Sequence, residues 1–170
     1  MPSPVGHAIG GLSAGWATGG RAGWPAWGWQ ALLFGAIGML PDIDLLFGAH
    51  SGPTHSVGAA VIVAAIAWAA TGFRARPAVV AAVFAAYGSH IFLDWLGDDT
   101  SAPLGVMALW PFSREYFMTP VPLMPAITRR YWLPGFWTHN LRAITFELLV
   151  LGPLLVVAWW GRRDRHRGRR

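Results

Sequence analysis

The chain has 170 residues, of which 54% are hydrophobic and only 12% are charged, about half the charged share of an average globular protein. This composition excludes a disordered chain and indicates a single-domain integral membrane protein. Cysteine is absent, so neither disulfides nor thiolate metal ligands are available. The net charge of +5 does not indicate a nucleic-acid partner, because six of the thirteen arginines lie in residues 162–170.

Five apolar segments are candidates for membrane helices. Residues 5–18 are short and rich in glycine, which makes them the weakest candidate, whereas residues 24–40 begin with tryptophans typical of a membrane interface. Residues 56–73 carry no charge and would extend about 27 Å as a helix, enough to span the hydrocarbon core. Residues 77–96 and 144–160 complete the set.

The predicted fold is therefore all-α: a polytopic integral membrane bundle of four or five segments in residues 1–161, followed by a basic cytoplasmic tail, residues 162–170. The proline- and aromatic-rich residues 97–142 are predicted as one long outer loop. With the tail inside, as the positive-inside tendency favours, nine arginines fall inside and four outside. This topology places seven candidate functional residues at the outer ends of the segments: His7, Asp42, Asp44, His50, His55, His90 and Asp94.

The sharpest motif is the pair His90 and Asp94, near the end of the segment at residues 77–96. A spacing of four residues puts the imidazole and the carboxylate on one helix face. Ionisable groups at membrane depth are costly and therefore indicate function. Neutral imidazoles with carboxylates suit a divalent metal of the zinc class. The alternative is a structural pair in which Asp94 only hydrogen-bonds His90.

The end of the second segment carries two further carboxylates. Pro41 lacks an amide donor and restricts the residue before it, so the helix is expected to break or kink there. Asp42 and Asp44 would then follow in an extended stretch, with both carboxylates on one side, which suits metal bridging. A solvated turn is the alternative interpretation.

Two histidines precede the third segment. His50 and His55 flank a Gly-Pro turn, and Thr54 or Ser56 is expected to cap the helix that follows. These histidines are interpreted as facing the two aspartates, with a merely interfacial position as the alternative.

The remaining titratable residues give weaker signals. His7 is supported by its predicted position at the same membrane face. His139 is interpreted as interfacial, with a ligand or a proton donor as the alternatives, and Glu147 is less certain still. His166, in the arginine-rich tail, is interpreted as solvated.

At these motifs the chain resembles the YdjM-like family of small bacterial inner-membrane proteins, described as membrane-bound metal-dependent hydrolases. The resemblance covers roughly residues 5–115 and implies a location in the bacterial cytoplasmic membrane. It rests on an ordered set of short motifs: His7, Leu40-Pro41-Asp42-Ile43-Asp44, His50 with Thr54-His55-Ser56, Gly88-Ser89-His90 with Asp94, and Leu104-Gly105 with Leu109-Trp110-Pro111.

Ser51 departs from the family pattern, which typically has an arginine after the first histidine of this motif. If that arginine steadies a phosphate or carboxylate, the role shifts here to Arg114, Arg129 or Arg130. A more distant likeness is to the zinc-dependent phospholipase C and single-strand nuclease superfamily. That superfamily has a later HxxxD/E pair of ligands, which has no counterpart after Asp94 in this chain. The likeness therefore implies one or two metal ions and not a full cluster of three. Its ligand order falls on His7, Asp42 or Asp44, His55, and His90 with Asp94.

The sequence thus predicts a membrane-embedded metal-dependent hydrolase of a phosphoester, such as a phospholipid or a polyprenyl phosphate, with membrane lipids as partners. The cofactor is expected to be one or two zinc ions, with manganese or iron as alternatives. Asp42, Asp44 and His50 are the candidate catalytic residues, and a carboxylate not needed as a ligand can act as general base. The predicted metal ligands are His7, Asp42, Asp44, His55, His90 and Asp94.

Two non-enzymatic functions stay open. Histidine and aspartate also line metal-ion or proton pathways in transporters, although the clustering of the candidates at one face argues against a pathway. Alternatively, the metal only clamps the helices of a structural protein, and metal loss would then unfold it.

Overall fold

The computed structural model describes the whole chain except residues 20–26, 49 and 168–170. Within the described residues every named element is helical, which confirms the predicted all-α class. The elements in chain order are α1 (Pro4–Thr18), α2 (Trp27–Met39), η1 (Leu40–Phe47), η2 (Pro53–His55), α3 (Val57–Ala70), α4 (Pro77–Leu96) and α5 (Phe136–Arg167), where η denotes a 3-10 helix.

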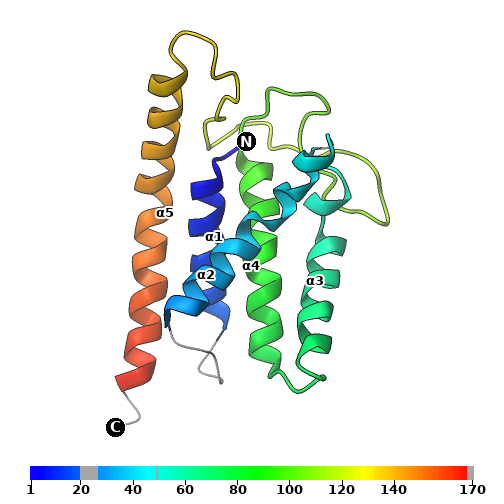
Figure 1. The fold of residues 1–170 in the computed structure, drawn as a ribbon, viewed down its shortest axis with the longest axis vertical. Helices are drawn as coiled ribbons and strands as arrows, with labels where there is room; N and C mark the ends of the chain where they lie inside the picture. The colour runs from blue at the N-terminus through cyan, green and yellow to red at the C-terminus, as the bar shows by residue number, and fades with distance from the viewer. Residues whose placement is uncertain (20–26, 49, 168–170) are drawn as a thin grey trace.

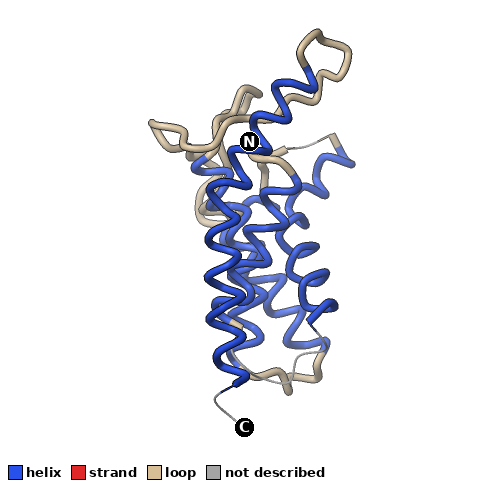
Figure 2. Tube along the Cα trace, turned by 90° about the vertical axis from the view of Figure 1, so that its left-hand side faces the viewer, coloured by secondary structure: helices blue, strands red, loops and turns tan. Residues whose placement is uncertain are grey.

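The bundle has two unlike ends. Figure 1 shows α1, α3, α4 and α5 running roughly along its long axis, with α2 crossing obliquely. The N-terminus, η1, η2 and the long connection from α4 to α5 gather at one end, which we call the loop end, and α5 ends at the other, as Figure 2 shows from the side. The candidate ligands therefore belong to the loop end.

Three stretches of the described residues are long and apolar enough to cross a membrane: Gly28–Phe47, Pro77–Leu96 and Phe136–Arg163. The predicted helical membrane bundle is therefore confirmed. The apolar helix α3 is shorter, and α1 lies within the bundle in contact with α2, α4 and α5. The number of segments that cross the membrane stays a prediction.

Prolines set several helix boundaries. Helix α4 begins at Pro77 and ends at Leu96, as predicted. Helix α2 ends at Met39, before Pro41, so the predicted break is confirmed, although the beginning of this segment at Trp24 lies outside the described residues. The predicted extended stretch that follows is wrong, because residues 40–47 form the 3-10 helix η1. Proline has the φ of a first helical turn, so the chain starts a new, tighter helix there.

Helix α5 begins at Phe136, in a stretch predicted as loop, and continues through Arg167, beyond the predicted end of the segment at residue 160. Polar residues in its first two turns lower the hydropathy without breaking the helix. Asn140 also ties this part of α5 to the loop, because its side chain accepts from the Thr128 amide and donates to the Thr128 carbonyl, each at 2.9 Å. Hydropathy thus located the apolar part of this helix and missed its ends.

Close contacts with neighbouring helices explain the glycines of α1, and at Gly11 the contact is with the backbone of α2. A Cβ added to Gly11 would lie 2.5 Å from the Phe34 carbonyl oxygen, and one added to Gly38 would lie 2.4 Å from the His7 carbonyl oxygen. Both distances are too short for any side chain, so α1 and α2 meet backbone to backbone. This contact brings the His7 turn of α1 against the end of α2, where the aspartates begin.

A buried carboxylate on α5 holds the beginning of α1. Glu147 is fully buried and accepts hydrogen bonds from the Ser3 amide, at 2.6 Å, and from the Ser3 hydroxyl. The same hydroxyl accepts from the Gly6 amide at 3.1 Å and caps the helix. A Cβ on Gly6 would lie 2.7 Å from Glu147 Oε2, so glycine leaves room for this contact. The negative charge also suits the positive end of the α1 dipole, one turn before His7.

The connection from α4 to α5 folds over the loop end. Val106 and Phe117 exchange two backbone hydrogen bonds of 3.0 and 2.9 Å. The Met107 amide donates to the Ser51 carbonyl, and the Val57 amide donates to the Ala108 carbonyl. These bonds attach the predicted outer loop to the histidine-bearing turn before α3.

Candidate metal centre

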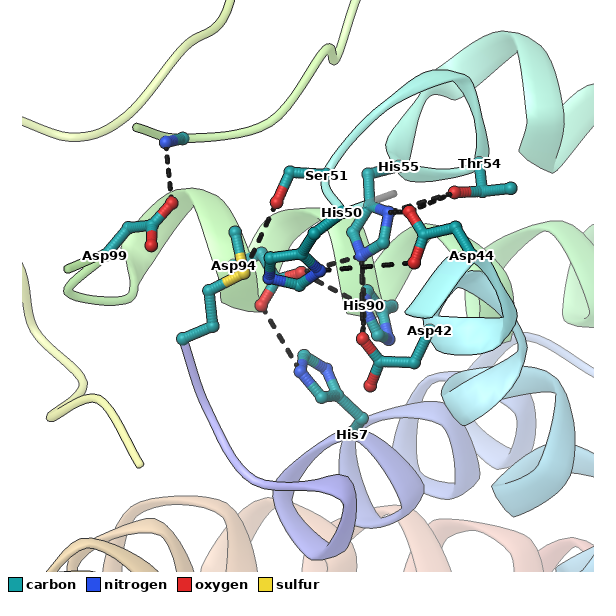
Figure 3. A network of polar contacts seen from close by, with 12 residues as sticks. His7, Asp42, Asp44, His50, Ser51, Thr54, His55, His90, Asp94 and Asp99 are labelled. Atoms are coloured by element: carbon teal, nitrogen blue, oxygen red, sulfur yellow. Dashed lines mark hydrogen bonds and ion pairs between the residues drawn. The ribbon is translucent and has the colours of Figure 1, made fainter. Parts of the chain in front are cut away.

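The predicted functional side chains, from five segments of the chain, meet at the loop end of the bundle (Figure 3). They form three overlapping groups whose ligand atoms lie within 4.8 Å of one another, and these groups can hold a metal ion. The groups are Asp42, Asp44, His50 and His55; His7, Asp42 and His90; and His55, His90 and Asp94.

Four of the donor atoms have the spacing of a metal-binding set. The Nε2 atoms of His55 and His90 lie 3.1 Å apart, and Asp94 Oδ2 lies 3.4 and 3.0 Å from them respectively. Asp42 Oδ1 lies 3.7 Å from His55 Nε2 and 3.8 Å from His90 Nε2. Four ligands held about 2.0–2.2 Å from a tetrahedral ion lie roughly 3.3–3.6 Å from one another. The distances among His55, His90 and Asp94 are close to this spacing, and Asp42 lies slightly farther from both imidazoles.

His7 adds a further nitrogen at the edge of this set. Its Nε2 lies 3.3 Å from Asp94 Oδ1, and its ring stacks on the His90 ring with centroids 3.6 Å apart. Asp42 belongs both to the group with His7 and to the group with His50 and His55. This shared position agrees with the bridging role predicted for that carboxylate.

Buried polar atoms in this cluster lack hydrogen-bond partners. They include both carboxylate oxygens of Asp94, Nδ1 of His7 and Oδ1 of Asp44. Asp94 and His7 are almost completely buried, and a buried charge without compensation is costly. A bound cation would compensate the negative charge of Asp94 and would accept the lone pairs of the facing imidazole nitrogens. The unpartnered atoms of the cluster therefore fit a metal ion.

The far nitrogens of two imidazoles are held by neighbouring groups. His90 Nδ1 lies 2.7 Å from the Gly38 carbonyl oxygen, to which it donates. His55 Nδ1 lies 3.2 Å from Asp44 Oδ2, which also accepts from the Thr54 hydroxyl at 2.9 Å. Such bonds orient metal-ligating histidines and leave Nε2 free for the ion. Asp44 is thereby placed to orient His55.

His50 and His55, which lie outside the membrane-spanning stretches, have opposite pKa shifts. Burial acts to lower the pKa of His55, but the facing carboxylates of Asp42 and Asp44 and the charge of Asp94 outweigh it and raise that pKa to about 9. Burial lowers the pKa of His50, and the neighbouring charges of His55 and Arg129 lower it further. The carboxylates thus favour a positive charge beside them, which can be a proton on His55 or a bound cation that replaces it.

The family comparison agrees with this architecture. A family model described as YdjM inner membrane protein matches residues 1–165. The chain belongs to this family. No curated protein and no solved structure matches it. As a YdjM inner membrane protein with a buried histidine and aspartate cluster, the chain is a membrane protein whose cluster can hold a metal ion.

The structure of this YdjM family member brings every predicted ligand together, and their individual roles stay predictions. His139 and Glu147 lie outside the cluster: His139 Nε2 donates to the Ala126 carbonyl at 2.8 Å, and Glu147 binds Ser3. Of the three arginines considered, Arg129 and Arg130 line a cavity beside the cluster, and Arg129 Nη2 lies 3.5 Å from His50 Nε2. Ser51 is fully buried.

Sequence reasoning missed three residues that support the cluster. Gly38 offers its carbonyl to His90, Thr54 donates to Asp44, and the Tyr87 hydroxyl donates to the Thr54 carbonyl at 2.7 Å. One signal was available for Tyr87, which precedes His90 by three residues and so shares its helix face. A backbone carbonyl and an ordinary threonine give no comparable signal.

Removing the Thr54 hydroxyl tests the orienting role of Asp44. We expect Thr54→Val to weaken metal binding modestly and Asp44→Asn to weaken it about 10- to 100-fold, the range found when partners of ligating histidines are removed. Zinc titration with a competing chelator measures both affinities. Thr71→Val is the matched control, because the Thr71 hydroxyl bonds the Trp68 carbonyl at the end of α3. Unchanged affinity in Asp44→Asn would contradict the role.

Proposed function

We propose that this protein is a membrane-embedded metal-dependent hydrolase that cleaves a phosphoester. The observation that carries the proposal is a donor cluster that is buried yet open on one side. Asp94, His55 and His90 are at most 1% exposed, whereas the side chains of Asp42 and His50 are 22% and 20% exposed. Structural metal sites are closed, and catalytic ones keep an open position.

The proposed cofactor is zinc, in one or two ions. Imidazole nitrogens and carboxylate oxygens are its usual ligands when thiolates are absent, and manganese and iron bind similar sets. The sharing of Asp42 between two groups of donors supports a second ion position. Metal analysis of purified protein decides both identity and number.

Each side chain has a role that follows from its position. When bound, the ion supplies Lewis acidity and lowers the pKa of water towards 7. His50, at the open edge of the cluster, is placed to accept a proton as general base. Arg129 beside it is placed to hold an anionic oxygen of the substrate. Asp44 keeps His55 oriented.

The proposed orientation has the C-terminus in the cytoplasm and the metal centre at the outer face. It is supported by the arginines of residues 162–170 and by Arg74 and Arg76, which lie between α3 and α4, away from the loop end. The chain has no cysteine, so a single cysteine at Ser101 reports on the loop end alone. It should react with an impermeant maleimide added to intact cells without their outer membrane. Protection until the cells are lysed would reverse the orientation.

Removal of the metal distinguishes a hydrolase from a structural protein whose metal only clamps the helices. The cluster joins α1, η1, η2 and α4, which is the observation that favours a clamp. We expect zinc-loaded protein to hydrolyse bis(p-nitrophenyl) phosphate or a phospholipid, and chelated protein to keep its helical circular dichroism while losing that activity. Unfolding on chelation, with no hydrolysis of any tested phosphoester by zinc-, manganese- or iron-loaded protein, would favour the clamp.

A further inference from the structure

A cavity of about 540 Å³ opens beside the metal centre at the loop end. Asp42 and His50 line it from the cluster, and Arg129, Arg130 and His139 line it from the loop and α5. Because Arg129 lies within 3.5 Å of His50, a guanidinium reaches the edge of the cluster. A cavity of this size holds a small molecule or the head of a lipid.

The part of the cavity beside His50 favours an anion, because Arg129 reaches it there and Arg130 also lines the cavity. Asp98 and Asp99 also line it, but the two oxygens of Asp99 accept from the Ser101 and Gly105 amides at 3.0 and 2.9 Å. Figure 3 shows Asp99 apart from the cluster. The guanidinium groups present paired donors that match the oxygens of a phosphate.

Apolar residues border this polar cavity on two sides. Leu45 and Leu133 line it, and their chain neighbours are strongly exposed: Leu46 80%, Phe47 81%, Tyr131 75% and Trp132 66%. Exposed aromatic and aliphatic side chains at the end of a membrane bundle are typical of the lipid interface. We call these four neighbours the apolar rim. A charged cavity whose lining continues along the chain into exposed apolar residues matches a molecule with an anionic head and hydrocarbon chains.

We propose that this cavity binds the phosphate-bearing head of a membrane phospholipid, with Arg129 as the phosphate-binding residue and the acyl chains leaving over the apolar rim. This inference rests on the proposed function, for which it names the substrate class. Because Arg129 lies 3.5 Å from His50, a phosphate held by it would lie beside the metal centre.

Binding of short-chain lipids to detergent-purified, zinc-loaded protein tests the inference. The probes are dioctanoylphosphatidic acid, dioctanoylglycerol, which lacks the phosphate, and glycerol 3-phosphate, which lacks the chains. We expect only the first to bind tightly, and Arg129→Ala to weaken that binding about 10- to 100-fold, as for a lost hydrogen bond to a charged group. Arg114→Ala is the matched control, from the same connection but outside the cavity lining. The zinc content of all variants should be equal.

The outcomes separate this inference from the proposed function. Equal binding of phosphatidic acid by wild type and Arg129→Ala would overturn the inference, and so would tight binding of glycerol 3-phosphate alone, which would indicate a soluble phosphoester as ligand. Either result leaves hydrolysis by the metal centre intact. Conversely, phosphatidic acid bound through Arg129 by a protein that hydrolyses no phosphoester would support the binding site and refute the hydrolase.

Discussion

Asp94→Asn is expected to reduce phosphoester hydrolysis by more than about 100-fold, beyond the 10- to 100-fold cost of losing a partner of a metal ligand. Asp94 contacts three histidines, at 3.3 Å from His7, 3.4 Å from His55 and 3.0 Å from His90. Asparagine keeps the size of the side chain and removes the negative charge that balances a cation. The rate constant of the metal-loaded variant, measured on the substrate that wild type cleaves, checks this expectation.

Glu115→Gln provides the matched control for that variant. Glu115 is exposed on the connection between α4 and α5, and its substitution also replaces a carboxylate by an amide. It should leave the rate and the metal content unchanged. If Asp94→Asn hydrolysed the substrate at the rate of wild type, the proposed centre would be in the wrong place.

Gly38→Ala is expected to destabilise the protein and weaken its metal site together. The added Cβ would lie 2.4 Å from the His7 carbonyl oxygen, and backbone atoms cannot rotate away from it. Overpacking of this kind costs about 1–3 kcal/mol, occasionally more. Separation of α1 from α2 would also move the Gly38 carbonyl that orients His90 and the turn that carries His7. A lowered unfolding midpoint in detergent and a weaker zinc affinity are the two measurements.

Gly88→Ala is the control for the packing argument. Gly88 lies in α4, two residues before His90, and a Cβ there would meet nothing within 4 Å. Alanine in an open helical position is favoured over glycine by up to about 1 kcal/mol. This variant should therefore be as stable as wild type or more so. Equal stability of Gly38→Ala and Gly88→Ala would contradict the close helix contact.

Hydropathy and proline positions predicted much of the fold. The boundaries of α4 follow from Pro77 and from the polar residues after Leu96, and the end of α2 follows from Pro41. The first turns of α5 could not be predicted in the same way, because polar residues there are satisfied by the loop through Asn140. Nor did hydropathy show that α1 is glycine-rich because its neighbours approach it closely, with backbone contact to α2 at Gly11.

The candidate site was predictable where its geometry is local. The spacing of His90 and Asp94 puts them on the same face of one helix. The remaining ligands were predicted to lie near them because the topology puts all of these residues at the same side of the membrane. Contacts across the bundle have no such signal. Arg129 was one of three arginines expected near His50, and only the fold shows that this one reaches it from 79 positions away in the chain. The Gly38 carbonyl meets His90 because α2 contacts α4 at that point.

The metal content of detergent-purified protein tests the central claim most directly. Inductively coupled plasma mass spectrometry is applied to wild type and to the double variant His90→Ala/Asp94→Ala, after loading with zinc, manganese and iron in turn, with Glu115→Gln as the control. The cluster predicts one or two equivalents of a transition metal in wild type and in the control, and their loss in the double variant. Wild-type protein that holds no transition metal after loading with any of the three would contradict it.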